Sequence, residues 1–139
     1  MRALITVSGI QDFNGTADDT VELVTDGVYT RTEDGFEIYY LESELTGLAG
    51  TATRVEVRPG SVTVERAGTL NACMEFKPGQ KSSFLYDTQF GSATLEVETR
   101  KINADLDDFG GEPCIDYVVN MEHTVSSKNK LKISVKGLR

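Results

Sequence analysis

Polar and apolar residues alternate along nearly the whole chain, in short segments separated by Gly, Asn or Asp. A period of two is typical of β-strands that bury one face, and no stretch of about ten residues keeps the apolar stripe of a helix. The pattern predicts strands over residues 2–11, 20–32, 36–45, 51–58, 61–67, 70–76, 82–88, 92–106, 113–123 and 129–137. With 139 residues, the chain is expected to be one all-β domain spanning residues 1–139.

The segment RVEVRPGSVTVERAG, residues 54–68, predicts a hairpin with a defined register. A turn at Pro59-Gly60 would pair Val57 with Val62, Val55 with Val64, and Arg54 with Glu65. Apolar residues then face apolar residues and opposite charges face each other, as a correct register requires. Pro-Gly favours a type II turn at this position.

The same phase, continued along the other strands, predicts a shared interior. The inward set is Phe36, Ile38, Tyr40, Leu70, Ala72, Met74, Phe76, Phe84, Tyr86, Leu95, Val97, Ile115, Tyr117, Val119, Met121, Leu131, Ile133 and Val135. Many antiparallel strands with short turns close as a barrel or stack as a sandwich, because open edges aggregate. We favour a single antiparallel up-and-down β-barrel of about 8–10 strands. Asp26-Gly27 inside a long strand predicts a bulge or a sharp bend.

Several apolar residues fall on the outward phase of the predicted strands: Ile5, Val7, Tyr39, Leu41, Leu85 and Val118. If neighbouring strands bring them together, they form a patch of the kind that marks a protein interface. Association into a homodimer through this patch is therefore one expectation.

The order of short motifs resembles the YwiB-like family of small bacterial proteins, a domain family of unknown function. The resemblance runs over essentially the whole chain through Thr46-Gly47, Thr51, Thr53, the segment 64–66, Gly68, Phe76, Gly79, Tyr86, Thr88, Gly91 and Thr99. It implies a calycin-like β-barrel and a bacterial cytoplasmic setting, and it implies no activity. Calycins hold small hydrophobic ligands, but fold analogy does not establish function. Gln89 stands where the family pattern has proline, and without tryptophan the chain lacks the signature of true lipocalins.

The net charge of −8 disfavours binding to nucleic acid or to an anionic membrane surface. Residues 123–139 hold five bases and no acid, but Lys130, Lys132 and Lys136 alternate with apolar residues. This alternation predicts a strand docked among acidic neighbours or a lysine-protected sheet edge. No signal peptide or membrane-spanning run is evident, so a cytoplasmic location with Cys73 and Cys114 as free thiols is expected.

Candidate catalytic and metal-binding residues are few. His123 is the sole histidine and stands in no catalytic motif, so no catalytic residue is assigned and an enzyme is not favoured. The acidic segment NADLDDFGGE, residues 103–112, places Phe109 and Asp116 where a calcium loop needs other oxygen ligands. We therefore expect no metal site and no cofactor, and we interpret this segment as a solvated loop.

Polar residues on the inward phase are the remaining candidates for a site. An inward Arg66 requires a carboxylate partner, a position at the barrel mouth or an anionic ligand, because a buried unpaired charge is unfavourable. The predicted ligand-binding residues are Arg66, Tyr40, Tyr86, Thr88, Thr99 and Tyr117. The expected function is a non-catalytic small-molecule-binding or interaction module, with a small acidic or amphipathic ligand. The alternatives are that Arg66 lies at the rim in water, and that the protein is a dimerising structural protein with a filled barrel.

Overall fold

The computed structural model describes residues 1–13, 16–43, 48–121 and 125–137, and in these ranges the chain is all-β. The strands are β1 (Arg2–Phe13), β2 (Thr16–Arg31), β3 (Phe36–Leu41), β4 (Thr51–Arg58), β5 (Ser61–Gly68), β6 (Leu70–Phe76), β7 (Lys81–Thr88), β8 (Gly91–Asn103), β9 (Leu106–Asp107), β10 (Gly110–Gly111), β11 (Cys114–Met121) and β12 (Val125–Gly137).

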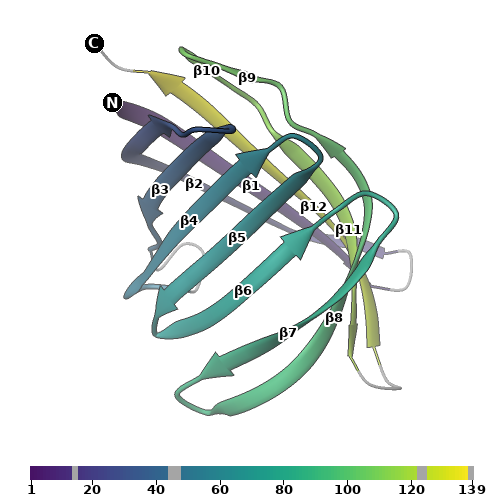
Figure 1. Ribbon diagram of the computed structural model, residues 1–139. Coiled ribbons are helices and arrows are strands. Elements are labelled where there is room, and N and C mark those ends of the chain that lie inside the picture. The colour runs from purple at the N-terminus through teal and green to yellow at the C-terminus, as the bar shows by residue number, and fades with distance from the viewer. Residues whose placement is uncertain (14–15, 44–47, 122–124, 138–139) are drawn as a thin grey trace.

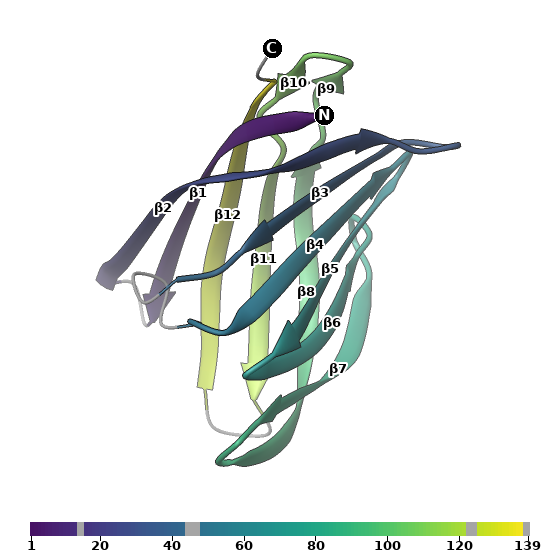
Figure 2. The same cartoon turned by 90° about the vertical axis from the view of Figure 1, so that its left-hand side faces the viewer.

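The ten long strands form a closed antiparallel barrel, as the alternation predicted (Figure 1). Neighbours follow chain order from β1 to β8, and the sheet continues through β11 to β12. Pairing of β1 with β12, from Ala3 opposite Gly137 to Phe13 opposite Ser127, closes the wall. The view turned by 90° shows the tilted strands wrapping around the interior (Figure 2). Closure removes the free sheet edges that would otherwise promote aggregation.

The β4–β5 hairpin has the predicted register. The structure pairs Val57 with Val62, Val55 with Val64, and Arg54 with Glu65. Gly60 has φ of 79°. The proline ring of Pro59 holds a negative φ, so this pair of residues forms a type II turn.

The core is one cluster of inward-facing side chains that lines the barrel. Most of the predicted inward set is buried in it, including Ile38, Phe76 and Ile133. Ile5 and Val7, however, are 0% and 7% exposed, so their predicted outward position is wrong. The physical reason is their pairing with core residues of β12, because directly opposite residues in an antiparallel pair point to the same face.

Gly27 does not mark a bulge, so the bulge half of that prediction is wrong. The β1–β2 register is continuous where Ala3 pairs with Gly27, and it shifts only between Gln11 and Asp12. A Cβ at Gly27 would collide with the Ile5 side chain and the Tyr39 carbonyl oxygen. Glycine is therefore needed here for the close approach of β1 and β3 to β2.

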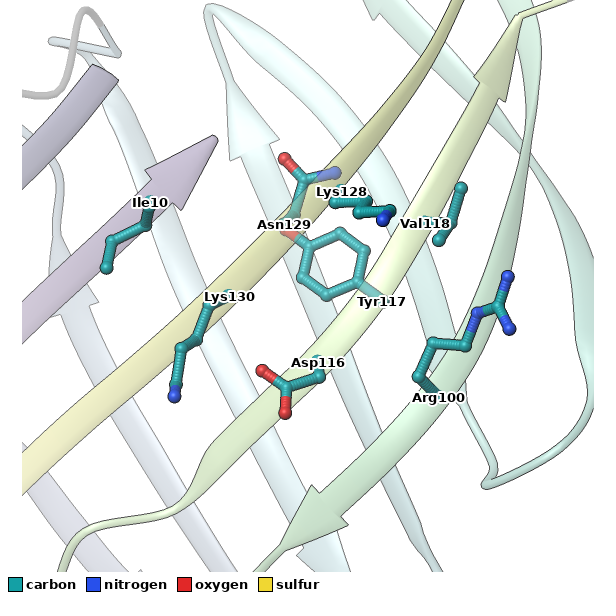
Figure 3. Close-up of a pocket in the computed structure, with 8 residues that line it drawn as sticks. All are labelled: Ile10, Arg100, Asp116, Tyr117, Val118, Lys128, Asn129 and Lys130. Atoms are coloured by element: carbon teal, nitrogen blue, oxygen red, sulfur yellow. The ribbon is translucent and has the colours of Figure 1, made fainter. Parts of the chain in front are cut away.

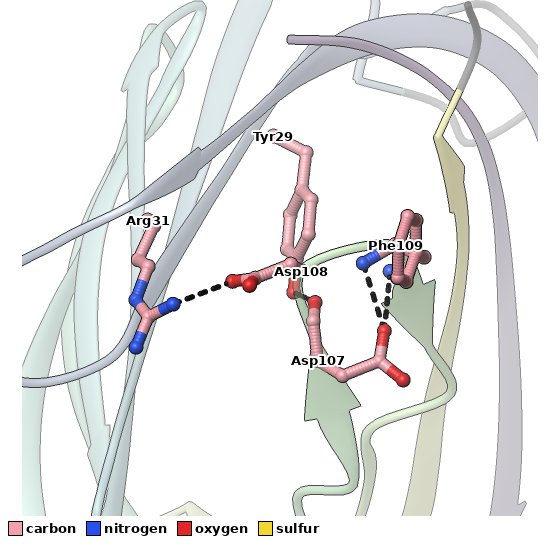
Figure 4. Close-up of polar contacts among 6 residues, drawn as sticks. Tyr29, Arg31, Asp107, Asp108 and Phe109 are labelled. Carbon is pink, nitrogen blue, oxygen red and sulfur yellow. Dashed lines mark hydrogen bonds and ion pairs between the residues drawn. The ribbon is translucent and has the colours of Figure 1, made fainter.

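Residues 104–113, which connect β8 to β11 and include most of the acidic segment, form a strap at the barrel end where the N-terminus lies (Figures 1 and 4). Its short strands β9 and β10 pair with each other, and β10 also pairs with β12. The Tyr29 hydroxyl donates to the Asp107 carbonyl at 2.6 Å, and Arg31 pairs with Asp108 at 2.8 Å. The Asp107 carboxylate accepts from the Phe109 and Gly110 amides. The Tyr29 and Arg31 contacts tie the strap to β2, and its acidic side chains remain exposed, as the interpretation as a solvated segment expected.

The weakest seam of the wall lies between β6 and β7. Their ladder contains only Leu70 opposite Thr88 and Asn71 opposite Asp87, after which the strands diverge (Figure 1). A continued register would place Tyr86 opposite Ala72. Instead Tyr86 is 37% exposed, so its predicted interior position is wrong. The β6–β7 ladder ends at Asp87, the residue next to Tyr86, so no β6 residue pairs with Tyr86.

β12 lies between β1 and β11 and is therefore not a sheet edge. Its apolar residues Leu131, Ile133 and Val135 are buried, and its lysines are exposed. Lys132 pairs with Glu112 at 3.5 Å, while Lys130 lies opposite Asp116 in the ladder. The lysines thus belong to a strand docked beside acidic residues, one of the two predicted arrangements.

Candidate functional site

Five polar residues meet inside the barrel and form what we call the interior polar cluster: Tyr40, Glu42, Thr53, Arg66 and Tyr117. Strand pairing places three of them, because Tyr40 lies opposite Thr53 on β4, and Thr53 lies opposite Arg66 on β5. Glu42 follows β3 directly, and its amide donates to the Thr51 carbonyl at 2.9 Å. It therefore continues the inward phase of Ile38 and Tyr40.

The Glu42 carboxylate is the centre of the cluster. Its side chain is 2% exposed, and its Oε1 accepts a hydrogen bond from the Thr53 hydroxyl at 2.8 Å. The Arg66 Nε lies 3.9 Å from the same oxygen, an ion-pair distance that is too long for a hydrogen bond. The Tyr40 hydroxyl is also within hydrogen-bonding reach of Glu42 and Thr53. Arg66 thus has the carboxylate partner that an inward arginine requires.

Two buried atoms of this pair lack hydrogen-bond partners among the described residues. They are Oε2 of Glu42, an acceptor, and Nε of Arg66, a donor. Unpaired buried polar atoms are rare in native proteins, and each costs about 1–3 kcal/mol. The Arg66 side chain is 18% exposed, so solvent reaches part of it. The cluster therefore has hydrogen-bonding capacity for a further group.

The two tyrosines of the cluster stay neutral in this environment. Burial raises the pKa of Tyr40 well above its ordinary value of 10.0, and the negative charge of Glu42 raises it further, while Arg66 acts in the opposite direction. Burial also raises the pKa of Tyr117, and again the Arg66 charge opposes the shift. Both hydroxyls are therefore hydrogen-bond donors and acceptors near neutral pH.

Of the predicted site residues, the structure brings Arg66, Tyr40 and Tyr117 together. Thr99 is 1% exposed and lies opposite Tyr117 in the β8–β11 ladder, and its hydroxyl lacks a partner among the described residues. Tyr86 lies at the β6–β7 seam. The Thr88 hydroxyl accepts from the Phe90 amide and donates to the Gly91 carbonyl, so it stabilises the β7–β8 turn.

Thr88 also lines a polar pocket of ≈ 480 Å³ at the barrel end opposite the strap. The other lining residues come from the β5–β6 and β7–β8 connections and include Thr69 and Asn71. The Asn71 side chain bridges the Gly68 backbone at 3.0 and 3.2 Å. The polar groups on this side of the pocket are therefore engaged in turn structure.

Sequence reasoning missed Glu42, although it carried a signal. The alternation of the predicted strand 36–45 places Glu42 in the same phase as Ile38 and Tyr40. An acidic residue on an inward phase is as informative as an arginine there, because each needs a buried partner. Following the inward phase of residues 36–45 and of residues 61–67 together would have identified Glu42 as the carboxylate partner of Arg66.

A second candidate site is an open groove on the outer face, with a volume of ≈ 470 Å³ (Figure 3). It crosses β1, β12, β11 and β8 and is lined by Ile10, Arg100, Asp116, Tyr117, Val118, Lys128, Asn129 and Lys130. Tyr117 borders this groove and also belongs to the interior polar cluster, where it packs on Phe76. The register shift between Asp116 and Tyr117 leaves Arg100 without a ladder partner on β11. Val118 is only 9% exposed between these longer side chains. The groove is predominantly basic on an otherwise acidic chain.

In the described parts of the chain, no three His, Cys, Asp or Glu side chains cluster as metal ligands. His123, the one histidine, lies outside the described residues. No helix within those same ranges is long and apolar enough to cross a bilayer.

Fold and site together define a closed antiparallel β-barrel with a buried polar cluster. The chain belongs to the family described as Domain of unknown function (DUF1934), whose model matches residues 5–133. It is 26% identical over 119 residues to the "Uncharacterized beta-barrel protein YwiB" of Bacillus subtilis, covering 86% of this chain and 82% of that protein. The crystal structure of the ywiB protein from Bacillus subtilis has the same fold, with a TM-score of 0.78 at 23% identity over 99% of this chain and 92% of the other. The resemblance inferred from the sequence is confirmed.

Proposed function

We propose that this protein is a non-catalytic module that binds a small amphipathic molecule inside its barrel, at the interior polar cluster. The observation that carries the proposal is the complementary pair of unpaired atoms, Glu42 Oε2 and Arg66 Nε. A structural ion pair that only stabilised the fold would gain from satisfying both atoms within the protein. A ligand group that enters the cluster and hydrogen-bonds to both atoms would account for their lack of partners within the protein.

Binding would combine this polar contact with the apolar interior. Phe76 and Tyr117 pack edge to face with ring centroids 4.9 Å apart, and Tyr117 is close enough to Arg66 to sense its charge. Aromatic and aliphatic walls around a few convergent polar groups are typical of small-molecule sites. The polar end of a ligand would therefore bind at Arg66 while its apolar part contacts the rings.

Native mass spectrometry of the freshly purified full chain tests the proposal. We expect a reproducible non-covalent adduct that leaves on denaturation and is lost in Arg66→Ala. The matched control is Arg54→Ala on the same hairpin, where the arginine faces outward and pairs with Glu37 at 3.2 Å. If Arg66→Ala fails to fold, Glu42→Gln replaces it. Adduct-free wild-type protein, or an adduct that survives in Arg66→Ala and Glu42→Gln, would overturn the proposal.

A dimerising interaction module is the second candidate function, supported by apolar side chains on the outer face of β1–β3. Leu4, Val24, Val28 and Leu41 are 37%, 55%, 44% and 60% exposed. Val28 also lies opposite Tyr39 of β3, one of the apolar residues predicted to face outward. We expect a dimer to dissociate in Val24→Lys but not in Leu85→Lys on distant β7, as measured by light scattering. A wild-type monomer would exclude this candidate.

We also propose a cytoplasmic location. Cys73 and Cys114 are both free thiols, and Cys73 is exposed. Exposed unpaired thiols persist in a reducing compartment. Fractionation of cells producing the untagged chain tests this, and recovery outside the cytoplasm would contradict it.

A further inference from the structure

We infer that the interior polar cluster selects an uncharged planar ligand with a carbonyl and an N–H side by side, as in a carboxamide or the amide edge of a heterocycle. This inference rests on the proposed function and specifies the ligand class for the same site. The sequence predicts an acidic or amphipathic ligand, because it identifies no particular carboxylate as the partner of an inward Arg66. Glu42 already supplies a negative charge beside Arg66, so the site does not need an acidic ligand to balance the arginine.

The charge balance of the cluster disfavours an ionic ligand. Arg66 already has a carboxylate 3.9 Å from its Nε, and the Glu42 side chain is 2% exposed. Charges interact strongly in such a poorly solvated site. A carboxylate ligand at Arg66 would be repelled by Glu42, and an ammonium ligand at Glu42 would be repelled by Arg66. An uncharged ligand avoids both repulsions.

The unpaired atoms specify the hydrogen-bonding pattern. Glu42 Oε2 needs a donor and Arg66 Nε needs an acceptor, and both atoms are buried. An amide supplies these two functions on neighbouring atoms, with N–H directed to Glu42 and C=O accepting from Arg66. A carboxylate supplies acceptors only, so it would leave Glu42 Oε2 unpaired.

Nearby aromatic rings favour a planar ligand. Tyr40 is 1% exposed and is within reach of Glu42, and Tyr117 packs on Phe76. Ring faces and edges pack well against flat π-systems. A flat amide-bearing ring therefore matches the walls and the polar groups of the same site.

Benzamide and benzoate are a matched pair of probes with nearly the same shape. Titrating each into the ¹⁵N-labelled full chain and following amide chemical shifts gives both affinities. We expect benzamide to bind about tenfold more tightly than benzoate, because the site is built for an N–H donor. N,N-dimethylbenzamide, which lacks the donor, should lose this binding in the wild-type protein.

Glu42→Gln gives the sharper test. Removing the negative charge leaves Arg66 unpaired, so the preference should reverse in favour of benzoate. The matched control is Glu56→Gln on the neighbouring β4, where the carboxylate pairs with Arg58 and is 30% exposed. This control should keep the preference for benzamide.

The outcomes separate this inference from the proposed function. Tighter binding of benzoate to the wild type, equal binding of dimethylbenzamide, or no binding of any probe overturns the inferred ligand class. An adduct lost in Arg66→Ala would still support a small-molecule module in each of these cases. Absence of both probe binding and adduct overturns the two together.

Discussion

At the scale of single residues, the Glu42–Arg66 pair dominates the interior. Both groups had to leave water for the barrel, and desolvation of an ion pair offsets much of its attraction. Removing one partner leaves the other charge without compensation. The pair is therefore expected to be coupled in stability as well as in binding.

A double-mutant cycle measures this coupling. We expect Glu42→Leu to lower the free energy of unfolding by about 1–3 kcal/mol, since Arg66 loses its partner but keeps some contact with water. The double variant Glu42→Leu/Arg66→Met should recover part of that loss. Urea unfolding of Glu42→Leu, Arg66→Met, the double variant and the wild type gives the four free energies of unfolding. Strictly additive effects of the two substitutions would contradict the coupling.

Cys73 provides a second test at this scale. Although Cys73 is exposed, partial desolvation raises the pKa of its thiol above the ordinary 9.0, and the charges of Glu65, Glu75 and Glu56 raise it further. In a Cys114→Ser background, Glu65→Gln should lower that pKa and speed alkylation by iodoacetamide at pH 7.5 about two- to threefold, because only the thiolate reacts. Glu37→Gln is the control and should leave the rate unchanged. An unaltered rate in Glu65→Gln would contradict the electrostatic contribution.

At the scale of strands, Gly27 of β2 lies where its two neighbouring strands approach closely. Its missing side chain lets the Ile5 side chain and the Tyr39 backbone approach from the two neighbouring strands. Gly9 on β1 has no atom within 4 Å of the position of an added Cβ. The two glycines therefore differ in packing although both lie within long strands.

Alanine at these two positions should have opposite effects. Gly27→Ala is expected to lower the free energy of unfolding by about 2–4 kcal/mol, because the added methyl overlaps side chain and backbone. Gly9→Ala should be neutral or stabilise by up to about 1 kcal/mol, because alanine restricts the unfolded chain. Thermal and urea unfolding measure both changes. Equal effects in the two variants would contradict the packing account.

The strands show which features can be predicted from the sequence and which cannot. Alternation is a local property, so it predicted the strands, the β4–β5 register and the lysine face of β12. The role of Gly27 depends on β3, and the exposure of Tyr86 depends on where β7 leaves β6. The Glu42–Arg66 pair likewise joins residues on different strands. Such features require the position of a neighbour that single-strand periodicity does not contain.

At the scale of the whole molecule, buried tyrosines make the stability of the barrel depend on pH. Burial raises the pKa values of Tyr29, Tyr40 and Tyr117. For Tyr29, the negative charges of Asp107 and Asp108 raise the pKa further. In the unfolded chain these groups titrate near their ordinary value of 10.0. Above that pH the unfolded state ionises first, and the folded state loses relative stability.

The free energy of unfolding should therefore be insensitive to these tyrosines below about pH 9 and fall above pH 10. Each buried tyrosine contributes a slope of roughly 1.4 kcal/mol per pH unit in that window. Tyr40→Phe and Tyr29→Phe should each reduce the slope. Urea unfolding between pH 8 and 11.5 measures the slopes, and unchanged slopes in both variants would contradict the linkage.

The seam between β6 and β7 has a practical consequence. Cys73 is exposed on β6, two residues beyond the last paired position of that ladder. A fluorescent dye attached there in a Cys114→Ser background would report the separation of the two strands by its polarity-dependent emission. Cys73 is thus a native attachment point for a dye that reports movement of β6 relative to β7.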